Sequence, residues 1–312
     1  MRVVYLGTPA AAVAPLEALL ASRHEVAAVV TRPDKPRDHR GGTPAPSPVK
    51  RVAVEAGVPV LQPRGGRDPE LPAWLSATGA DIGCACAFGF LLPPPVLAAL
   101  PRGIINLHFS LLPAYRGAAP VQRALLDGIE VTGVCTFQID EGMDTGPLLA
   151  CREVPVLDGE DAGLLTARLA EIGAGLVVET LDGLQDGTIR PRPQPPEGSL
   201  APKVEPAEAR LDFRAPAERV VHAVRAFTPS PGAWTTFRGR RLKVSRAAPA
   251  PRGTGAALAP GKVAVGPGGE LLAGTIDGAV ELVTVQPEGK RAMSGAEFAR
   301  GARLPEDEWL GR

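Results

Sequence analysis

Two polar side chains, Asn106 and His108, lie near the end of an apolar stretch, GIINLHF over 103–109, that is typical of a β-strand. Because side chains alternate between the two faces of a strand, the amide and the imidazole point the same way. In a parallel sheet, polar groups at the carboxyl ends of the strands lie where such sheets hold substrates. The pair is a candidate substrate site, with a hydrogen-bonded structural pair as the alternative.

A second candidate region is the acidic loop in QIDEGMDTGPLL at 138–149, which follows another predicted strand. It contains Asp140, Glu141 and Asp144, and three neighbouring carboxylates are too costly to bury without partners. The loop is either a solvated acidic turn, in which glycines serve the turn geometry, or the source of a functional carboxylate.

Together, Asn106, His108 and Asp144 would supply an amide donor, a titratable imidazole and a carboxylate. These groups are suited to the transfer of an acyl group to an amine, which passes through a tetrahedral oxyanion. Removing a donor aimed at such a developing charge typically costs about 3 to 4 kcal/mol. No serine or cysteine nucleophile is needed for this chemistry.

Alternating strand and helix patterns in the first half of the chain must position these groups. Strands are predicted at 3–6, 25–31, 59–62, 81–87, 103–109 and 131–139, and helices near 11–21 and over 160–182. Continuous apolar strands separated by helices favour an α/β fold with a mostly parallel sheet covered on both faces.

A proline-rich segment, RPRPQPPEGSLAPK at 190–203, divides the chain. Its prolines cannot continue a regular element and suit a semi-rigid linker. We predict a catalytic domain at 1–189, a linker at 190–205 and a second domain at 206–312. After a helix near 215–226, short strands at 233–237, 241–247, 261–265, 270–274 and 279–285 indicate a small β-barrel of the oligonucleotide-binding kind.

The composition is that of a globular protein, with 45% apolar and 22% charged residues among 312. The net charge is zero, but residues 1–200 contain 17 Lys and Arg against 22 Asp and Glu, and residues 201–312 contain 17 against 12. The C-terminal part is therefore the better candidate to meet an anion. Without an export signal or an apolar run of about 20 residues, we expect a cytosolic protein.

Neither a metal nor a nicotinamide cofactor is expected. The cysteines Cys84, Cys86, Cys135 and Cys151 lack the spacing of a zinc site, and three of them lie in apolar stretches where a thiol acts as a small buried hydrophobe. The turn GTP at 7–9 lacks the G-x-G-x-x-G pattern of dinucleotide-binding proteins.

The runs INLHFSLLPAYRGAAP from 105 and DEGMDTG from 140 closely resemble those of the formyl-folate transferases, and within them the members that act on methionyl-tRNA. Matching segments cover nearly the whole chain: GTP at 7–9, SPVK at 47–50, AFGFLLP at 87–93, RAFTPSP at 225–231 and QPEGKRAMS at 286–294. The resemblance implies a Rossmann-like catalytic domain, a linker and a C-terminal barrel that helps to hold tRNA. It also implies formyl transfer from 10-formyltetrahydrofolate to the α-amino group of methionyl-initiator tRNA, for translation initiation.

Family roles carry over to the matching positions. Asn106 and His108 would polarise the formyl carbonyl, and Asp144 would orient His108 and manage protons. The expected folate-binding residues are those around the pterin and those after the catalytic strand: Phe88, Gly89, Phe90, Leu91, Leu92, Ser110, Leu111, Leu112, Pro113 and Asp140.

The expected tRNA contacts come from cations that neutralise phosphates without reading sequence. The segment 32–50 matches a basic loop that enters the acceptor stem in relatives, although here Asp34 and Asp38 dilute its charge. The candidates are Lys35, Arg37 and Arg40 in this loop and, in the C-terminal part, Lys203, Arg240, Arg241, Lys243, Lys290 and Arg291.

Two alternatives remain open at this stage. A formyltransferase acting on a sugar-nucleotide amine would share Asn106, His108 and Asp144 but replace the C-terminal domain, against which RAFTPSP and QPEGKRAMS count. An RNA-binding module that lost catalysis would have no reason to keep three polar groups together. We expect a monomer that is not bound to a membrane.

Overall fold

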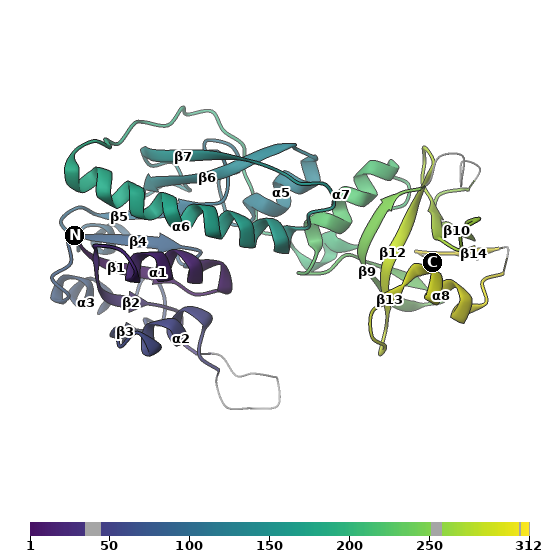
Figure 1. Cartoon of the computed structure of the whole chain (residues 1–312), viewed down its shortest axis with the longest axis horizontal. Coiled ribbons are helices and arrows are strands. Elements are labelled where there is room, and N and C mark those ends of the chain that lie inside the picture. The colour runs from purple at the N-terminus through teal and green to yellow at the C-terminus, as the bar shows by residue number, and fades with distance from the viewer. Residues whose placement is uncertain (35–44, 251–257, 306, 312) are drawn as a thin grey trace. The chain divides into compact units, whose positions relative to one another are not determined.

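The computed structural model describes residues 1–34, 45–250, 258–305 and 307–311. It forms two compact units (Figure 1). Unit 1 contains 1–120, 131–155 and 166–202, and unit 2 contains 121–130, 156–165 and 203–312. Residues 190–202 of the predicted linker thus group with unit 1. None of the described helices is long and apolar enough to cross a membrane.

The sheet of unit 1 has the strand order β3-β2-β1-β4-β5-β6-β7. Its strands are β1 Arg2–Gly7, β2 Glu25–Val30, β3 Val60–Leu61, β4 Ile82–Cys86, β5 Ile104–His108, β6 Val131–Gln138 and β7 Leu148–Pro155. The pairs from β3 to β5 are parallel, whereas β6 and β7 are antiparallel additions. The α/β fold with a mostly parallel sheet is therefore confirmed.

Helices follow the parallel strands, as continuous apolar strands require. They are η1 Ala10–Ala12, α1 Val13–Leu20, α2 Pro48–Glu55, α3 Leu71–Ala77, α4 Pro94–Leu97 and the long α6 Ala162–Asp186. Leu75 of α3 and Val96 of α4 share a buried cluster with Leu6 of β1 and Ile104 of β5. Residue 173 of α6 is a glycine because a Cβ there would meet Leu107 of β5 at 2.6 Å. Since Ile104 and Leu107 point to opposite faces, the sheet is covered on both sides.

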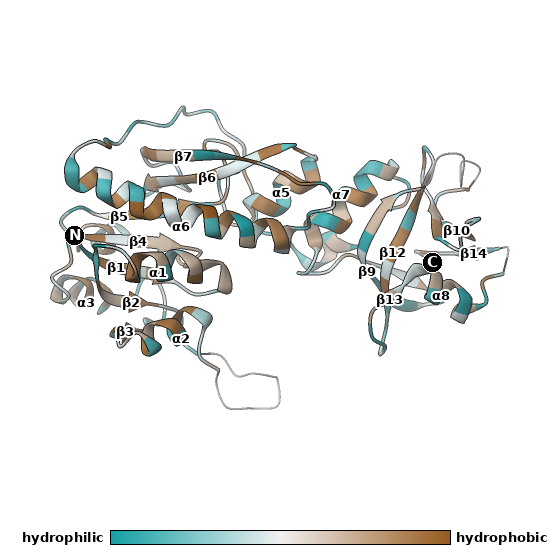
Figure 2. Cartoon of the chain, viewed as in Figure 1, coloured by the Kyte–Doolittle hydropathy of each residue, from teal (hydrophilic) through white to brown (hydrophobic). Residues whose placement is uncertain are grey.

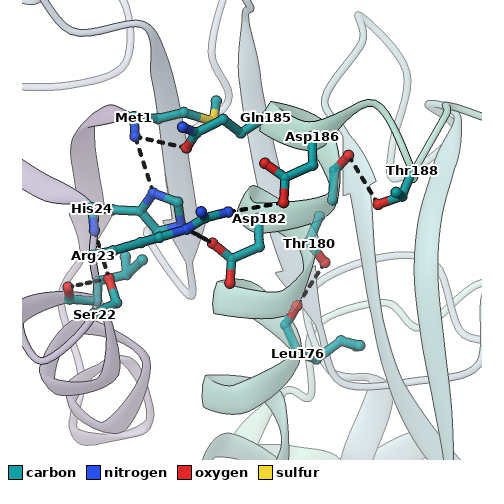
Figure 3. Close-up of polar contacts among 12 residues, drawn as sticks. Met1, Ser22, Arg23, His24, Leu176, Thr180, Asp182, Gln185, Asp186 and Thr188 are labelled. Carbon is teal, nitrogen blue, oxygen red and sulfur yellow. Dashed lines mark hydrogen bonds and ion pairs between the residues drawn. The ribbon is translucent and has the colours of Figure 1, made fainter.

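Polar contacts join the residues just before β1 and β2 to the C-terminal half of α6 (Figure 3). The buried His24 lies with Nδ1 3.1 Å from the Met1 amino group and Nε2 3.2 Å from an Asp182 oxygen. Arg23 donates to Asp182 at 2.5 Å and to Asp186 at 3.0 Å. Polar and apolar residues alternate along α6 (Figure 2), so its polar stripe can carry these contacts while its apolar stripe packs on the sheet.

Unit 2 contains an antiparallel sheet of order β14-β10-β11-β12-β9-β8, with β13 paired to β12. The strands are β8 Trp234–Phe237, β9 Arg240–Pro249, β10 Lys262–Val265, β11 Leu271–Gly274, β12 Ala279–Pro287, β13 Met293–Ser294 and β14 Glu308–Trp309. A bridge between Phe237 and Leu310 links the two edges. The sheet is therefore a nearly closed barrel, as expected.

The helices of unit 2 are α5 Pro120–Asp127, η2 Pro206–Ala209, α7 Ala217–Phe227 and α8 Gly295–Ala302. Helix α8 was not predicted, although Ser294 and Glu297 form its capping box. This S-x-x-E signature precedes a short amphipathic stretch in which Phe298 packs edge-on against Phe237 at 5.0 Å. The short strands β13 and β14 were also not predicted, because two residues carry no periodicity.

The cysteines differ from the expectation of buried thiols. Cys84 and Cys86 are free and buried in β4, as predicted. Cys135 of β6 and Cys151 of β7 face each other across the antiparallel ladder and form a disulfide. Directly opposed positions bring two Cβ atoms close enough for this bond, which the spacing in sequence does not reveal.

Candidate active site

The strand β5 presents Asn106 and His108 on the face that carries Ile104. Asn106 is half-buried, and its side-chain amide makes no hydrogen bond within the described part of the chain. His108 is 5% exposed, with its ring edge-on to Phe137 at 6.3 Å. The structure thus places an unengaged amide two residues from a buried imidazole, on one face of the sheet.

The imidazole of His108 is held through Nε2, which lies 2.9 Å from the carbonyl oxygen of Tyr115. Because a carbonyl oxygen only accepts, Nε2 carries a hydrogen. Nδ1 lies 3.6 Å from Oδ2 of Asp144, which is longer than a direct hydrogen bond. With Nε2 protonated, Nδ1 gains a hydrogen only when the ring becomes cationic. Nδ1 is therefore the nitrogen left to address a substrate.

Burial lowers the pKa of His108, because a charged ring is poorly solvated there. The negative charge of Asp144 and the Tyr115 carbonyl act in the opposite direction and raise the same pKa. The environment thus favours a neutral ring at rest, and the carboxylate stabilises the cation when it forms.

The backbone of Asp144 has an unusual conformation. Its φ is +52°, a left-handed conformation that is uncommon outside glycine. Oδ2 accepts a 2.7 Å hydrogen bond from the backbone N–H of Gly117. The side-chain amide of Gln194 donates to the carbonyl oxygens of Asp144, at 2.9 Å, and Gly146, at 2.6 Å. The acidic loop is therefore fixed rather than loosely solvated.

Asn106, His108 and Asp144 were predicted to share one site, and the structure brings His108 and Asp144 together. Three residues that hold them were not predicted: Tyr115, Gly117 and Gln194. Tyr115 has φ +60° and Gly117 φ +127°, so this stretch forms a turn. Gln194 lies in the proline-rich segment, where composition predicted only a linker.

The segment Phe88 to Leu92 follows β4, beside β5. Phe88 is buried and meets Phe90 edge-on at 5.2 Å between ring centres. The Arg32 guanidinium stacks over Phe90 at 4.4 Å and donates to the carbonyl of Gly89. Leu91 is 74% exposed and Leu92 half-buried, so the segment presents both apolar surface and backbone at the carboxyl edge of the sheet.

The other predicted folate residues are mostly engaged within the chain. Ser110 is fully buried, and its hydroxyl donates to the Ala114 carbonyl at 2.6 Å. Leu112, which Leu111 packs against, forms a cluster with Phe137, and the bond to Pro113 is cis. Asp140 is exposed and accepts hydrogen bonds from the Gly142 N–H and the Thr145 hydroxyl, so it shapes the acidic loop.

The predicted tRNA-binding residues fall into two groups. Lys35, Arg37 and Arg40 lie outside the described residues. The six candidates in unit 2 are all exposed: Lys203, Arg240, Arg241, Lys243, Lys290 and Arg291. Three of these, Arg240, Arg241 and Lys290, line a cavity of about 250 Å³ whose apolar wall includes Phe237, Leu242, Met293 and Phe298. Arg241 also stacks over Trp234 at 4.5 Å.

A second cavity, of about 180 Å³, belongs to unit 1 and is lined by Ile82, Arg102, Ile105, Gln138, Leu149 and Leu184. Ile105 points to the face opposite Asn106 and His108, so this cavity lies on the other face of the sheet from these two side chains.

Comparison with known proteins agrees with this geometry. Residues 1–181 match the formyl transferase family model, and residues 203–303 match that of the formyl transferase C-terminal domain. A methionyl-tRNA formyltransferase of Streptomyces coelicolor is 50% identical over 313 residues, covering 100% of both chains. One of Frankia casuarinae is 49% identical over 326 residues, covering 100% of this chain and 96% of its own.

Solved structures share the fold. HypX from Aquifex aeolicus in complex with tetrahydrofolic acid superposes with a TM-score of 0.67 at 20% identity, covering 96% of this chain and 47% of that chain. WlaRD, a sugar 3N-formyl transferase, gives a TM-score of 0.66 at 16% identity, covering 93% and 99%. Both family models and the full-length relatives agree, and the chain belongs to the formyl transferase family.

Proposed function

We propose that this chain transfers the formyl group of 10-formyltetrahydrofolate to the α-amino group of methionyl-initiator tRNA, in the cytosol, as a monomer and for translation initiation. Relatives named methionyl-tRNA formyltransferase are about 50% identical to this chain over its whole length, which supports this acceptor. The observation that carries the chemistry is the buried His108, with Nδ1 3.6 Å from the Asp144 carboxylate and the amide of Asn106 on the same strand face.

The α-amine of an aminoacyl ester can attack without a strong base. A free α-amino group has a pKa of about 7.7 to 8.0, and the adjacent ester lowers it, so much of the amine is neutral near pH 7. Attack on the formyl carbon places negative charge on the formyl oxygen. The Asn106 amide and the Nδ1–H of cationic His108 are the donors we assign to that oxyanion.

Asp144 then has two tasks. Its negative charge favours the imidazolium that faces the oxyanion, and its carboxylate can pass the proton that the attacking amine loses to Nδ1 of His108. This proton then goes to N10 of the folate as the bond between the formyl carbon and N10 breaks, which releases tetrahydrofolate. Oδ2 of Asp144 stays in place because the Gly117 N–H holds it at 2.7 Å. Most of the acceleration would come from positioning and charge stabilisation, with a modestly tuned histidine moving the proton.

For the folate, we propose the ledge formed by Phe88, Gly89, Phe90, Leu91 and Leu92, together with Ser110 to Pro113 and Asp140. Exposed apolar surface at Leu91 suits a flat ring, and the backbone of this segment offers hydrogen-bonding groups. Because Asp140 is tied to Thr145 and Gly142, we assign it to loop shape as well as to folate contact.

For the tRNA, we propose that the exposed cations of unit 2 contact phosphates. Arg240, Arg241 and Lys290 surround a cavity with an apolar wall, an arrangement that can accept an unpaired nucleotide with its base on the wall and its phosphate at the rim. We assign further phosphate contacts to the exposed Lys203, Lys243 and Arg291, and contacts at the acceptor stem to Lys35, Arg37 and Arg40.

A sugar-nucleotide amine is the second candidate acceptor, since WlaRD shares the fold. The full-length relatives named methionyl-tRNA formyltransferase are about 50% identical to this chain, against 16% for WlaRD, which favours tRNA. The test is to mix the protein with 10-formyltetrahydrofolate and either methionyl-initiator tRNA or a nucleotide-linked aminosugar. We expect rapid formylation of the tRNA alone. Transfer to the aminosugar alone would contradict the proposed acceptor. Transfer to neither substrate would contradict the proposed catalysis and favour a protein that only binds RNA.

A further inference from the structure

The proline-rich segment packs along the turn that holds His108. The Tyr115 N–H donates to the Ser199 hydroxyl at 2.8 Å, and the Arg116 N–H donates to the Ser199 carbonyl at 2.8 Å. The Ala201 N–H donates in return to the Arg116 carbonyl at 2.6 Å. This strand-like pairing fixes the turn from which the Tyr115 carbonyl reaches Nε2 of His108. The segment is therefore part of the catalytic unit.

Within this turn, Arg116 is a buried arginine, 7% exposed, and no carboxylate pairs with it in the part of the chain that the structure describes. Its guanidinium donates instead to Oε1 of Gln194 at 3.0 and 3.3 Å, to the Pro195 carbonyl at 2.8 Å and to the Pro196 carbonyl at 3.2 Å. A guanidinium has donors only, so the oxygen of the Gln194 amide must face it.

This contact decides which way the Gln194 amide points. With its oxygen on Arg116, its NH2 group faces the carbonyls of Asp144 and Gly146, at 2.9 and 2.6 Å. The carbonyl of Asp144 belongs to a residue with φ +52°, a conformation that surrounding contacts must maintain. Both hydrogens of the amide are therefore used to hold the loop that carries the carboxylate.

We propose that Arg116 and Gln194 form a positioning relay for the formyl transfer: Arg116 sets the orientation of the Gln194 amide, and Gln194 holds the backbone at 144–146 so that the Asp144 carboxylate lies beside His108. The inference rests on the proposed function for its catalytic consequence. Its structural part stands on the contacts alone. Neither residue is assigned a contact with substrate, so both are positioning residues.

The sharpest test is Gln194→Glu, which conserves size and keeps an oxygen for Arg116. The second carboxylate oxygen would face the carbonyl oxygens of Asp144 and Gly146, and these acceptors would repel it because none of them carries a hydrogen. We expect kcat to fall about 10- to 100-fold, as a displacement of about 1 Å at a reacting centre does, with both KM values within about twofold of wild type. The matched control is Glu197→Gln, the reverse change at an exposed position of the same segment, with unchanged kcat.

A second readout does not depend on activity. Asp144 raises the pKa of His108, so a displaced carboxylate must lower that pKa further. NMR titration of the His108 ring should show this shift in Gln194→Glu and not in Glu197→Gln. Arg116→Lys, which keeps the charge but loses the planar fork, should change kcat and the titration in the same direction.

Wild-type kcat and wild-type His108 titration in Gln194→Glu would overturn the relay. If this variant fails to fold, Gln194→Asn, which shortens the amide by one methylene, replaces it with the same expectations. A wild-type protein that formylates no acceptor would contradict the proposed function instead, while a His108 shift in the variant would still support the relay.

Discussion

The carboxylate of Asp144 is the group whose removal tests the site most directly, and Asp144→Asn is the change that disturbs the geometry least. The asparagine oxygen can still accept from the Gly117 N–H, which lies 2.7 Å from Oδ2 in the native chain. Because Oδ2 is also the carboxylate oxygen nearest to Nδ1 of His108, at 3.6 Å, an uncharged amide oxygen would then lie beside the imidazole. The shape of the loop persists, whereas the negative charge beside the imidazole is lost.

The size of the effect follows from the separation. At 3.6 Å and an effective dielectric constant of about 20, a carboxylate and an imidazolium attract by about 4 to 5 kcal/mol, an upper limit for the charge stabilisation that the variant loses. Allowing for residual solvation, we expect kcat to fall about 10²- to 10³-fold, with both KM values within about twofold.

The assay is steady-state formylation of charged initiator tRNA by 10-formyltetrahydrofolate, with each substrate varied while the other is saturating, and circular dichroism melting confirms folding. The control is Glu141→Gln, which removes a charge from an exposed position of the same loop and should leave kcat unchanged. A folded Asp144→Asn protein with kcat within about threefold of wild type would refute the charge argument, since that loss corresponds to less than 1 kcal/mol.

Three further results are expected. Burial and the nearby Met1 amino group lower the pKa of His24 in the folded chain below the ordinary histidine value of 6.5. The unfolded chain, in which the ring has its ordinary pKa, therefore binds the proton more readily. Neutral His24 therefore contributes to the free energy of unfolding above pH 6.5, and this contribution is lost as the pH falls below that value. Urea unfolding at about pH 7.5 and about pH 5.5 should show a larger loss of unfolding free energy in wild type than in His24→Asn. Gly117 has φ +127°, and Gly117→Ala adds a Cβ that meets the Ala201 carbonyl oxygen at 2.7 Å. This variant should lose about 1 to 3 kcal/mol of unfolding free energy and have a lower kcat. An unfolding free energy equal to that of wild type, by urea titration, would contradict this packing. Arg241→Gln should raise the KM for tRNA and reduce the salt slope of log affinity by about 0.7 to 0.9 per lost phosphate contact, with kcat unchanged, whereas an unaltered slope would remove Arg241 from the tRNA surface.

Much of the fold could be predicted from local pattern. Buried parallel strands are continuously apolar, so β1, β2, β4 and β5 stand out, and α6 follows from its helical spacing. The two-residue strands are too short for periodicity to indicate them, whereas α8 could have been predicted from its capping box. The Cys135–Cys151 pair depends on the register of β6 against β7.

The sequence by itself determined which side chains form the candidate site: Asn106 and His108 share a strand face because side chains alternate, and the family motifs mark Asp144. Only the tertiary structure decided how these groups are held. The Tyr115 carbonyl fixes the imidazole, the Gly117 N–H fixes the carboxylate, and Gln194 reaches the acidic loop from 50 residues away in sequence. Such contacts join residues through the folded backbone, and no periodicity in the chain records them, because each depends on where two distant turns come to lie.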